Sequence, residues 1–191
     1  MASWARPGEG LGWLVEDMAE RCLNVYREAP LRVEEDAQQE IAAAEGGYGR
    51  KQINELVQNG ADMMLGTGGR VMVVLSEDCL YVANEGEPFR ESGVETLLSA
   101  HISRKRGEEI GRFGLGFKSV TAISGAPQIF SRTVSFGFER ATAAGRIRAV
   151  VPEAPRIPLL RLASVLDPCE WAESDPVLDE LMGWAATVVR C

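Results

Sequence analysis

The chain has 191 residues, the length of one ordinary domain. Its hydrophobic share of 46% and charged share of 25% are typical of a folded globular protein. They exclude a disordered chain, a collagen-like repeat and a disulfide-rich miniprotein. Twenty basic against 28 acidic residues leave a net charge of −8, which repels phosphate backbones and anionic membranes. We therefore expect no DNA, RNA or membrane partner.

The cysteines and the amino terminus point to a cytoplasmic protein. The four cysteines form no CxxC pair, and the single histidine, His101, belongs to no histidine cluster, so the spacing predicts no zinc site. The sequence has no apolar run long enough to span a bilayer. Its first residues lack the basic and then apolar pattern of a signal peptide. We expect a cytoplasmic chain with free thiols.

Helical periodicity dominates the first third of the chain. Apolar residues recur at helical spacing over residues 11–29, and Pro30 prevents the helix from continuing. A second helix is predicted over residues 33–44, closed by Gly46 and Gly47. A third is predicted over residues 50–65, with apolar residues on one side.

The rest of the chain mixes strands with helices. A strand hairpin is predicted over residues 71–75 and 80–83, followed by a helix over 93–102 and a charged connector over 103–109. A glycine-rich segment over 111–116 opens another helix. Strands follow over 128–132 and 134–139, then a region punctuated by prolines, a helix over 177–185 and a strand over 187–190. This order predicts an α+β fold, a two-layer sandwich of helices on one face of a mostly antiparallel mixed sheet.

The third predicted helix places three polar residues on one face. Glu55, Asn59 and Asp62 stand at offsets of zero, four and seven. A carboxylate can accept a proton from an attacking water, an amide oxygen can bind a hard cation, and a second carboxylate can hold waters around that cation. A solvated helix face produces the same spacing, so this pattern leaves both interpretations open.

Two loops could meet a ligand. The segment from Gly111 to Ser119 has three glycines before a helix, where backbone N–H groups can hold phosphate. It is not a Walker A loop, because Phe117 separates Gly116 from Lys118, and it lacks the third glycine of GxGxxG. The loop over 84–89 directly follows a predicted strand, where ligands are often bound. The alternative for the first loop is a turn with tightly packed glycines, and the alternative for the second is a plain turn.

In order and spacing, these three segments resemble the motifs of the GHKL, or Bergerat-fold, ATPases, which include gyrase B subunits and ninety-kilodalton heat-shock chaperones. Residues 55–62 resemble the family's first box, and residues 110–117 resemble its phosphate-lid box in the chaperone form. Residues 46–52 and the loop over 84–89 are most similar to the sacsin-like and chaperone-like branch. The resemblance is strong over residues 37–139.

The resemblance implies a role for each matching residue. Glu55 would activate the attacking water and Asn59 would hold Mg²⁺. The residues implied to bind ATP are Asn59, Asp62, Asn84, Gly86, Gly111, Arg112, Phe113, Gly114, Leu115, Gly116, Phe117 and Lys118. Residues 90–110 correspond to the ATP lid, in which the run from Ser103 to Arg106 would supply local positive charge. Residues 1–36 would form an amino-terminal helical extension of one ATP-binding domain over 1–191.

The adenine-binding loop departs from the family pattern. Asn84 stands where most members have the aspartate that accepts the adenine amino group, and Pro88 replaces the usual second glycine. Asn84 Oδ1 can still accept that hydrogen bond, although its NH₂ group adds a donor to the site. The resemblance therefore implies phosphate binding more strongly than adenine selectivity.

The implied function is a magnesium-dependent ATPase that hydrolyses ATP to ADP and drives conformational change in a chaperone-like or remodelling protein. The alternative is a nucleotide-sensing or interaction module without hydrolysis. A sensor histidine kinase needs a phosphoacceptor histidine on a helical hairpin, and His101 is misplaced for that role. A type II topoisomerase is disfavoured by the acidic charge. The chain ends in a strand without a closing turn, so we expect an amino-terminal fragment of a longer, homodimeric protein.

Overall fold

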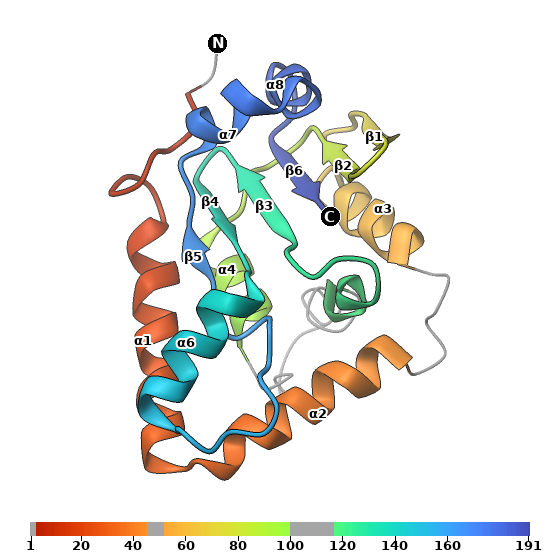
Figure 1. Cartoon of the computed structure of the whole chain (residues 1–191). Coiled ribbons are helices and arrows are strands. Elements are labelled where there is room, and N and C mark those ends of the chain that lie inside the picture. The colour runs from red at the N-terminus through yellow and green to blue at the C-terminus, as the bar shows by residue number, and fades with distance from the viewer. Residues whose placement is uncertain (1–2, 46–51, 100–116) are drawn as a thin grey trace.

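A computed structural model describes residues 3–45, 52–99 and 117–191 (Figure 1). Its helices are α1 (Gly12–Glu28), α2 (Leu31–Glu45), α3 (Gln52–Asp62), α4 (Glu91–Leu98), the 3-10 helix η1 (Phe117–Ala122), α6 (Arg140–Val150), α7 (Pro168–Ser174) and α8 (Pro176–Met182). Its strands are β1 (Val71–Leu75), β2 (Leu80–Asn84), β3 (Gln128–Ser131), β4 (Val134–Gly137), β5 (Ser164–Val165) and β6 (Thr187–Arg190). The protein is thus α+β, as predicted.

In the described part of the chain, the six strands form one open sheet in the order β1-β2-β6-β3-β4-β5. Every recorded strand pair is antiparallel. The last strand therefore lies in the middle of the sheet, where β6 pairs with β2 on one side and β3 on the other. This position completes the backbone hydrogen bonding of three strands far apart in the sequence.

One face of the sheet packs against the long helices. Alternation along β2 turns Val82 toward this face, where it joins Ile129 and Phe136 in the main core. Helices α1, α3, α4 and η1 cover that core with buried apolar residues, among them Leu56 and Val94. Beyond the sheet, α1 also packs against α2 and α6 around the buried Tyr26, and Figure 1 shows this lobe below the strands.

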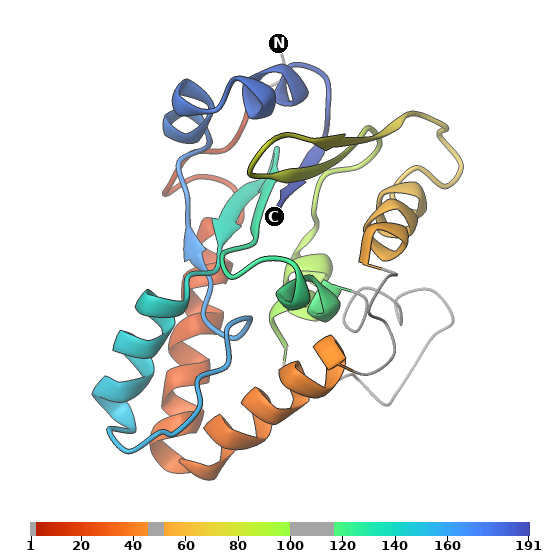
Figure 2. The ribbon, with the colours of Figure 1, turned by 45° about the vertical axis from the view of Figure 1, so that its right-hand side comes forward.

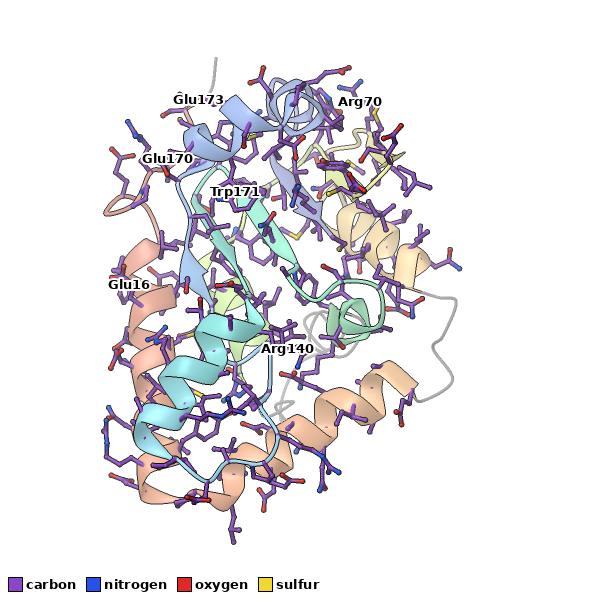
Figure 3. The ribbon with its side chains drawn as sticks, viewed as in Figure 1. Glu16, Arg70, Arg140, Glu170, Trp171 and Glu173 are labelled. Atoms are coloured by element: carbon purple, nitrogen blue, oxygen red, sulfur yellow. The ribbon has the colours of Figure 1, made fainter. Side chains whose placement is uncertain are left out.

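The opposite face carries two short helices. Tyr81 and Ala83, which alternate with Val82, pack there with Phe130 and with residues of α7 and α8. Figure 3 shows Trp171 of α7 on this side, and its ring lies 6.2 Å from that of Phe130. The architecture is compatible with the predicted two-layer sandwich, and α7 and α8 pack in addition on the second face of the sheet.

The predicted helices over 11–29, 33–44 and 177–185 and all five predicted strands are confirmed, with ends shifted by a few residues. The helix expected over 50–65 ends at Asp62, and that expected over 93–102 ends at Leu98. The helix expected after the glycine-rich segment is the short 3-10 helix η1. None of the helices in the described ranges is long and apolar enough to cross a membrane.

Three elements were missed in the segment expected to be a proline-punctuated region. Helix α6 is rich in alanine and arginine, and only Ala143 and Ile147 of its residues are buried. Such a short apolar stripe produces no clear helical periodicity. Strand β5 has two residues, and α7 begins at Pro168 after the capping carboxylate of Asp167.

A half-buried ionic network joins the sheet to α8. Asp175 caps α8 by accepting a 3.0 Å hydrogen bond from the backbone N–H of Leu178. Its Oδ2 also accepts hydrogen bonds from Tyr81 Oη at 2.7 Å and Arg190 Nε at 2.8 Å. Burial by itself raises the pKa of Asp175, but these hydrogen bonds outweigh it and hold that pKa below its usual value.

The substitution Asp175→Asn should therefore destabilise the fold at neutral pH by about 1–3 kcal/mol, because a neutral amide leaves the Arg190 guanidinium without its charged partner. A lowered native pKa means that the stabilisation is present above the unfolded pKa of about 4 and is lost as pH falls through the native pKa. Urea unfolding at pH 7 and pH 3 should show a difference between variant and wild type that shrinks in acid. Asp179→Asn, at an exposed position on α8, is the control. An equal effect of both variants at pH 7 would contradict the importance of the network.

Candidate functional site

Three of the predicted site residues, Asn59, Asn84 and Phe117, meet at a cavity between α3 and the sheet. Asn59 comes from α3 and Asn84 from the end of β2, and both side chains line this cavity of about 30 Å³. Both residues are buried. Most of the other lining residues are apolar, including Leu56, Val82 and Ile129. We call this space the Asn59–Asn84 cavity.

The carboxamide of Asn84 has a defined orientation. Its Nδ2 donates a 2.7 Å hydrogen bond to the backbone carbonyl of Glu85. Among the described residues, Oδ1 accepts no recorded hydrogen bond, so an acceptor remains for a ligand donor. Gly60 of α3 lies directly beside it, because a Cβ added there would stand 3.2 Å from Asn84 Cβ. The absence of a side chain at Gly60 lets α3 approach the end of β2 closely.

The other two polar residues of the α3 face do not line the cavity. Glu55 and Asp62 are half-buried, whereas Asn59 is only 7% exposed. The three residues share one side of the helix, as their spacing predicts, but only Asn59 points into the Asn59–Asn84 cavity. Glu55 lies one turn earlier along α3, toward the amino-terminal end of the helix.

The loop after β2 returns the chain toward the sheet. Gly86 has a φ of +97°, and a Cβ there would lie 2.5 Å from the carbonyl oxygen of Met63. Gly86 therefore has a structural reason to be glycine, and it does not line the cavity. Pro88 is half-buried, and Phe89, whose N–H donates to Ser131 Oγ at 2.9 Å, supplies part of the cavity wall.

Thr187 is a cavity residue that the sequence analysis missed. It lies on β6 directly opposite Asn84 of β2, and it also lines the cavity. Its hydroxyl donates a 3.0 Å hydrogen bond to Ser131 Oγ, which leaves the threonine oxygen able to accept. A polar residue at the start of the otherwise apolar run over 187–189 was the available signal. The position of Thr187 at the cavity depends on the pairing of β6 with β2, and these two strands are far apart in the sequence.

The glycine-rich segment lies outside the described residues. This applies to Gly111, Arg112, Phe113, Gly114, Leu115 and Gly116, and also to residues 46–51 and the lid residues 100–110. The next residue, Phe117, is buried, lines the Asn59–Asn84 cavity and packs against Phe138 at a ring distance of 6.3 Å.

Lys118 is directed to a different part of the molecule from Phe117. It is buried, and the charged groups that act on it are Arg161, Glu40 and Asp36. Burial lowers the pKa of Lys118, and the nearby Arg161 lowers it further, whereas the two carboxylates raise it. Lys118 does not line the Asn59–Asn84 cavity, so the expectation that it adds charge beside a triphosphate receives no support from its position.

Glu40 anchors the same charged cluster to the backbone. Its carboxylate accepts hydrogen bonds from the N–H groups of Leu159 at 2.6 Å and Leu160 at 2.8 Å. Burial raises the pKa of Glu40, although these hydrogen bonds and the nearby Lys118 oppose the shift. Glu40 therefore joins α2 to the segment before β5 by two buried hydrogen bonds, and the charge of Lys118 in η1 lies near it.

The described residues contain no group of three or more His, Cys, Asp or Glu side chains that could hold a metal ion by themselves. Asn59, which lines the cavity, carries a carboxamide oxygen, a ligand type that Mg²⁺ accepts beside phosphate oxygens. A search of protein-family models and of curated proteins finds no match to this chain.

The substitution Gly86→Ala should lower the free energy of unfolding by about 1–3 kcal/mol, because alanine is strained at a φ of +97° and its Cβ meets the Met63 carbonyl. Gly125→Ala is the matched control, since a Cβ there meets no atom within 4 Å and its φ lies outside the left-handed region. The urea midpoints of the two variants provide the comparison. If Gly86→Ala is as stable as Gly125→Ala, the close contact with the Met63 carbonyl has no structural importance.

Proposed function

We propose that this chain is an ATP-binding domain of the GHKL type, which binds ATP with Mg²⁺ at the Asn59–Asn84 cavity and hydrolyses it to ADP. The observation that most supports the proposal is the meeting of Asn59 and Asn84, from two separate sequence motifs, at one cavity. The residue after the third motif, Phe117, lines the same cavity. The proposal also rests on the motif resemblance, because a fold alone does not establish an activity.

The cavity lining suits the base of a nucleotide. Asn84 Oδ1 is oriented as an acceptor by the hydrogen bond from Nδ2 to the Glu85 carbonyl, so it can receive the adenine amino group. The Thr187 oxygen, directly across the strand pair, can accept a second hydrogen bond or hold a bridging water. Apolar side chains such as Val82 and Ile129 would bury the ring faces.

The phosphates would be bound by the glycine-rich segment, which directly precedes Phe117 in the sequence. Backbone N–H groups of such a segment can hold phosphate oxygens. Asn59 would contribute its amide oxygen to a bound Mg²⁺, and this ion would neutralise phosphate charge. Glu55, half-buried one helical turn before Asn59, would accept a proton from the attacking water.

Nucleotide binding would require the cavity to open. Its volume of about 30 Å³ is roughly a tenth of the volume of a small ligand pocket, which is about 300 Å³. Met63 and Leu97 are side chains of the lining that could move without breaking a recorded hydrogen bond. Binding coupled to such opening agrees with a role in conformational change, in a chaperone-like or remodelling protein.

A module that binds nucleotide without hydrolysis is the second candidate. The observation that favours it is the position of Glu55, which does not line the cavity in this structure. In that case the protein would sense nucleotide through the same cavity. Binding measurements and turnover measurements, made separately, distinguish the two candidates.

Calorimetric titration with ATP, ADP and a non-hydrolysable analogue, with and without Mg²⁺, tests the binding. We expect Asn59→Ala to weaken ATP binding chiefly when Mg²⁺ is present, because the amide oxygen would act through the cation. Asn54→Ala, at an exposed position on the same helix, should bind as wild type does. Equal weakening of Asn59→Ala in EDTA would refute the magnesium role, and failure of all three nucleotides to bind would refute the proposed site.

The catalytic role of Glu55 has its own test. Glu55→Ala should retain ATP affinity within a few-fold while its steady-state hydrolysis falls by about 10²- to 10⁴-fold, the usual contribution of a general base. Glu16→Ala, at an exposed position on α1, controls for loss of a helical carboxylate. Hydrolysis that is unchanged in Glu55→Ala would exclude Glu55 as the base. Normal binding by a wild type that does not hydrolyse ATP would favour the second candidate.

A further inference from the structure

Within residues 3–45, 52–99 and 117–191, strand β1 is an edge strand whose one strand partner is β2. Figure 2 brings the hairpin of β1 and β2 forward, where β1 lies at the outer margin of the sheet. An edge strand presents a row of backbone N–H and C=O groups that another strand can pair with. The register of the sheet shows which residues of β1 present those groups.

The hydrogen bonds fix the direction of each backbone group on β1. Leu80 and Cys191 exchange two 2.9 Å hydrogen bonds, so the even-numbered residues of β2 bond to β6. The N–H of Glu85 donates to the carbonyl of Arg70 at 2.9 Å, so the odd-numbered residues of this segment bond to β1. Residues alternate in this way along any antiparallel pair. In the register of Met72 with Ala83, the bonded residues of β1 are therefore even-numbered.

It follows that Val71, Val73 and Leu75 direct their N–H and C=O groups away from β2. The side chains of this edge are also exposed, since Val73 is 42% and Leu75 is 79% exposed. The five residues of β1 include no charge and no proline. Natural edge strands usually carry such residues to prevent pairing with other chains, and β1 lacks them.

The ends of β1 carry opposite charges. Arg70 precedes the strand, and Glu77 and Asp78 follow it, all of them exposed. Figure 3 shows Arg70 on the same side of the molecule as the β1–β2 hairpin, where its guanidinium carbon lies 3.6 Å from the Trp184 ring centroid. An antiparallel partner with the same sequence would bring its acidic end beside Arg70. A second copy is therefore complementary to β1 in charge as well as in hydrogen bonding.

We propose that β1 is a homodimerisation surface, on which a second copy of this chain pairs its own β1 antiparallel about a two-fold axis at Val73. In this register Val73 faces its own equivalent and Val71 faces Leu75. Each of these pairs joins residues whose free backbone groups point toward the partner, and each exchanges two hydrogen bonds. The two sheets become one continuous antiparallel sheet with an isologous interface.

The contact is small, because it joins two five-residue strands and the exposed side chains beside them. Interfaces of this size belong to the class of transient complexes. The dimer should therefore form and dissociate with protein concentration. This inference uses no property of the proposed nucleotide site, so the two can fail independently.

Sedimentation equilibrium over a wide range of protein concentration tests the dimer. Leu75→Lys should raise the dissociation constant at least about tenfold, because each dimer then contains two charges at its apolar interface. Leu31→Lys is the matched control, since Leu31 is 80% exposed on α2 and the new charge is the same. A wild type that is monomeric throughout, or equal effects of the two variants, would overturn the proposal.

The register has a separate test in disulfide cross-linking. Val73→Cys places its thiol opposite its own equivalent, and a hydrogen-bonded pair has a Cα separation of about 5.5 Å, within the range that a disulfide spans. Val71→Cys faces Leu75, so its two thiols lie about 14 Å apart along the strands. Oxidation with diamide should cross-link Val73→Cys faster than Val71→Cys. The wild type should also cross-link more slowly, and it measures the background from the native cysteines. Equal cross-linking of both variants would overturn this register.

Discussion

Strand β6 is inserted between β2 and β3, and it joins β1-β2 and β3-β4-β5 into one sheet. The carboxyl-terminal residues 187–190 satisfy the backbone groups of two strands that would otherwise both be open edges. The same insertion places Thr187 opposite Asn84 and so completes the polar side of the Asn59–Asn84 cavity. It also draws α8 over the second face, where Asp175 binds Tyr81 of β2 and Arg190 of β6.

The Asn59–Asn84 cavity combines an apolar wall with a few oriented polar groups. Burial of an amide without a hydrogen bond is costly, and the fold reduces this cost for Asn84 by binding its Nδ2 to the Glu85 carbonyl. The remaining acceptor, Oδ1, then has a fixed position. A fixed acceptor selects a ligand that places a hydrogen-bond donor at that point. The small volume means that part of any ligand-binding energy would be used to move side chains, which couples binding to conformation.

The sheet is protected unequally at its two ends. Strand β5 has two residues and lies beside α1 and the segment that follows α6, so it presents a short edge. Strand β1 is longer, apolar and more exposed. It has no charged residue, although a single one would discourage pairing with another chain. Because the net charge is −8, copies of this chain repel one another over distance. A contact that pairs Arg70 with Glu77 and Asp78 of a second copy would oppose this repulsion.

Local sequence patterns were sufficient to predict many of the helices and strands. Apolar periodicity identified α1 and α2, and β-branched runs identified the hairpin of β1 and β2, because these signals arise from neighbours a few residues apart. Spacing also placed Asn59 on the same face as Glu55. It could not identify α6, whose two buried residues form too short a stripe. No local pattern indicated that β6 lies inside the sheet, that Thr187 faces Asn84, or that Lys118 lies near the charges of Glu40 and Arg161 and not at the cavity. Strand order and burial depend on contacts between residues far apart in the chain, and no local pattern contains that information.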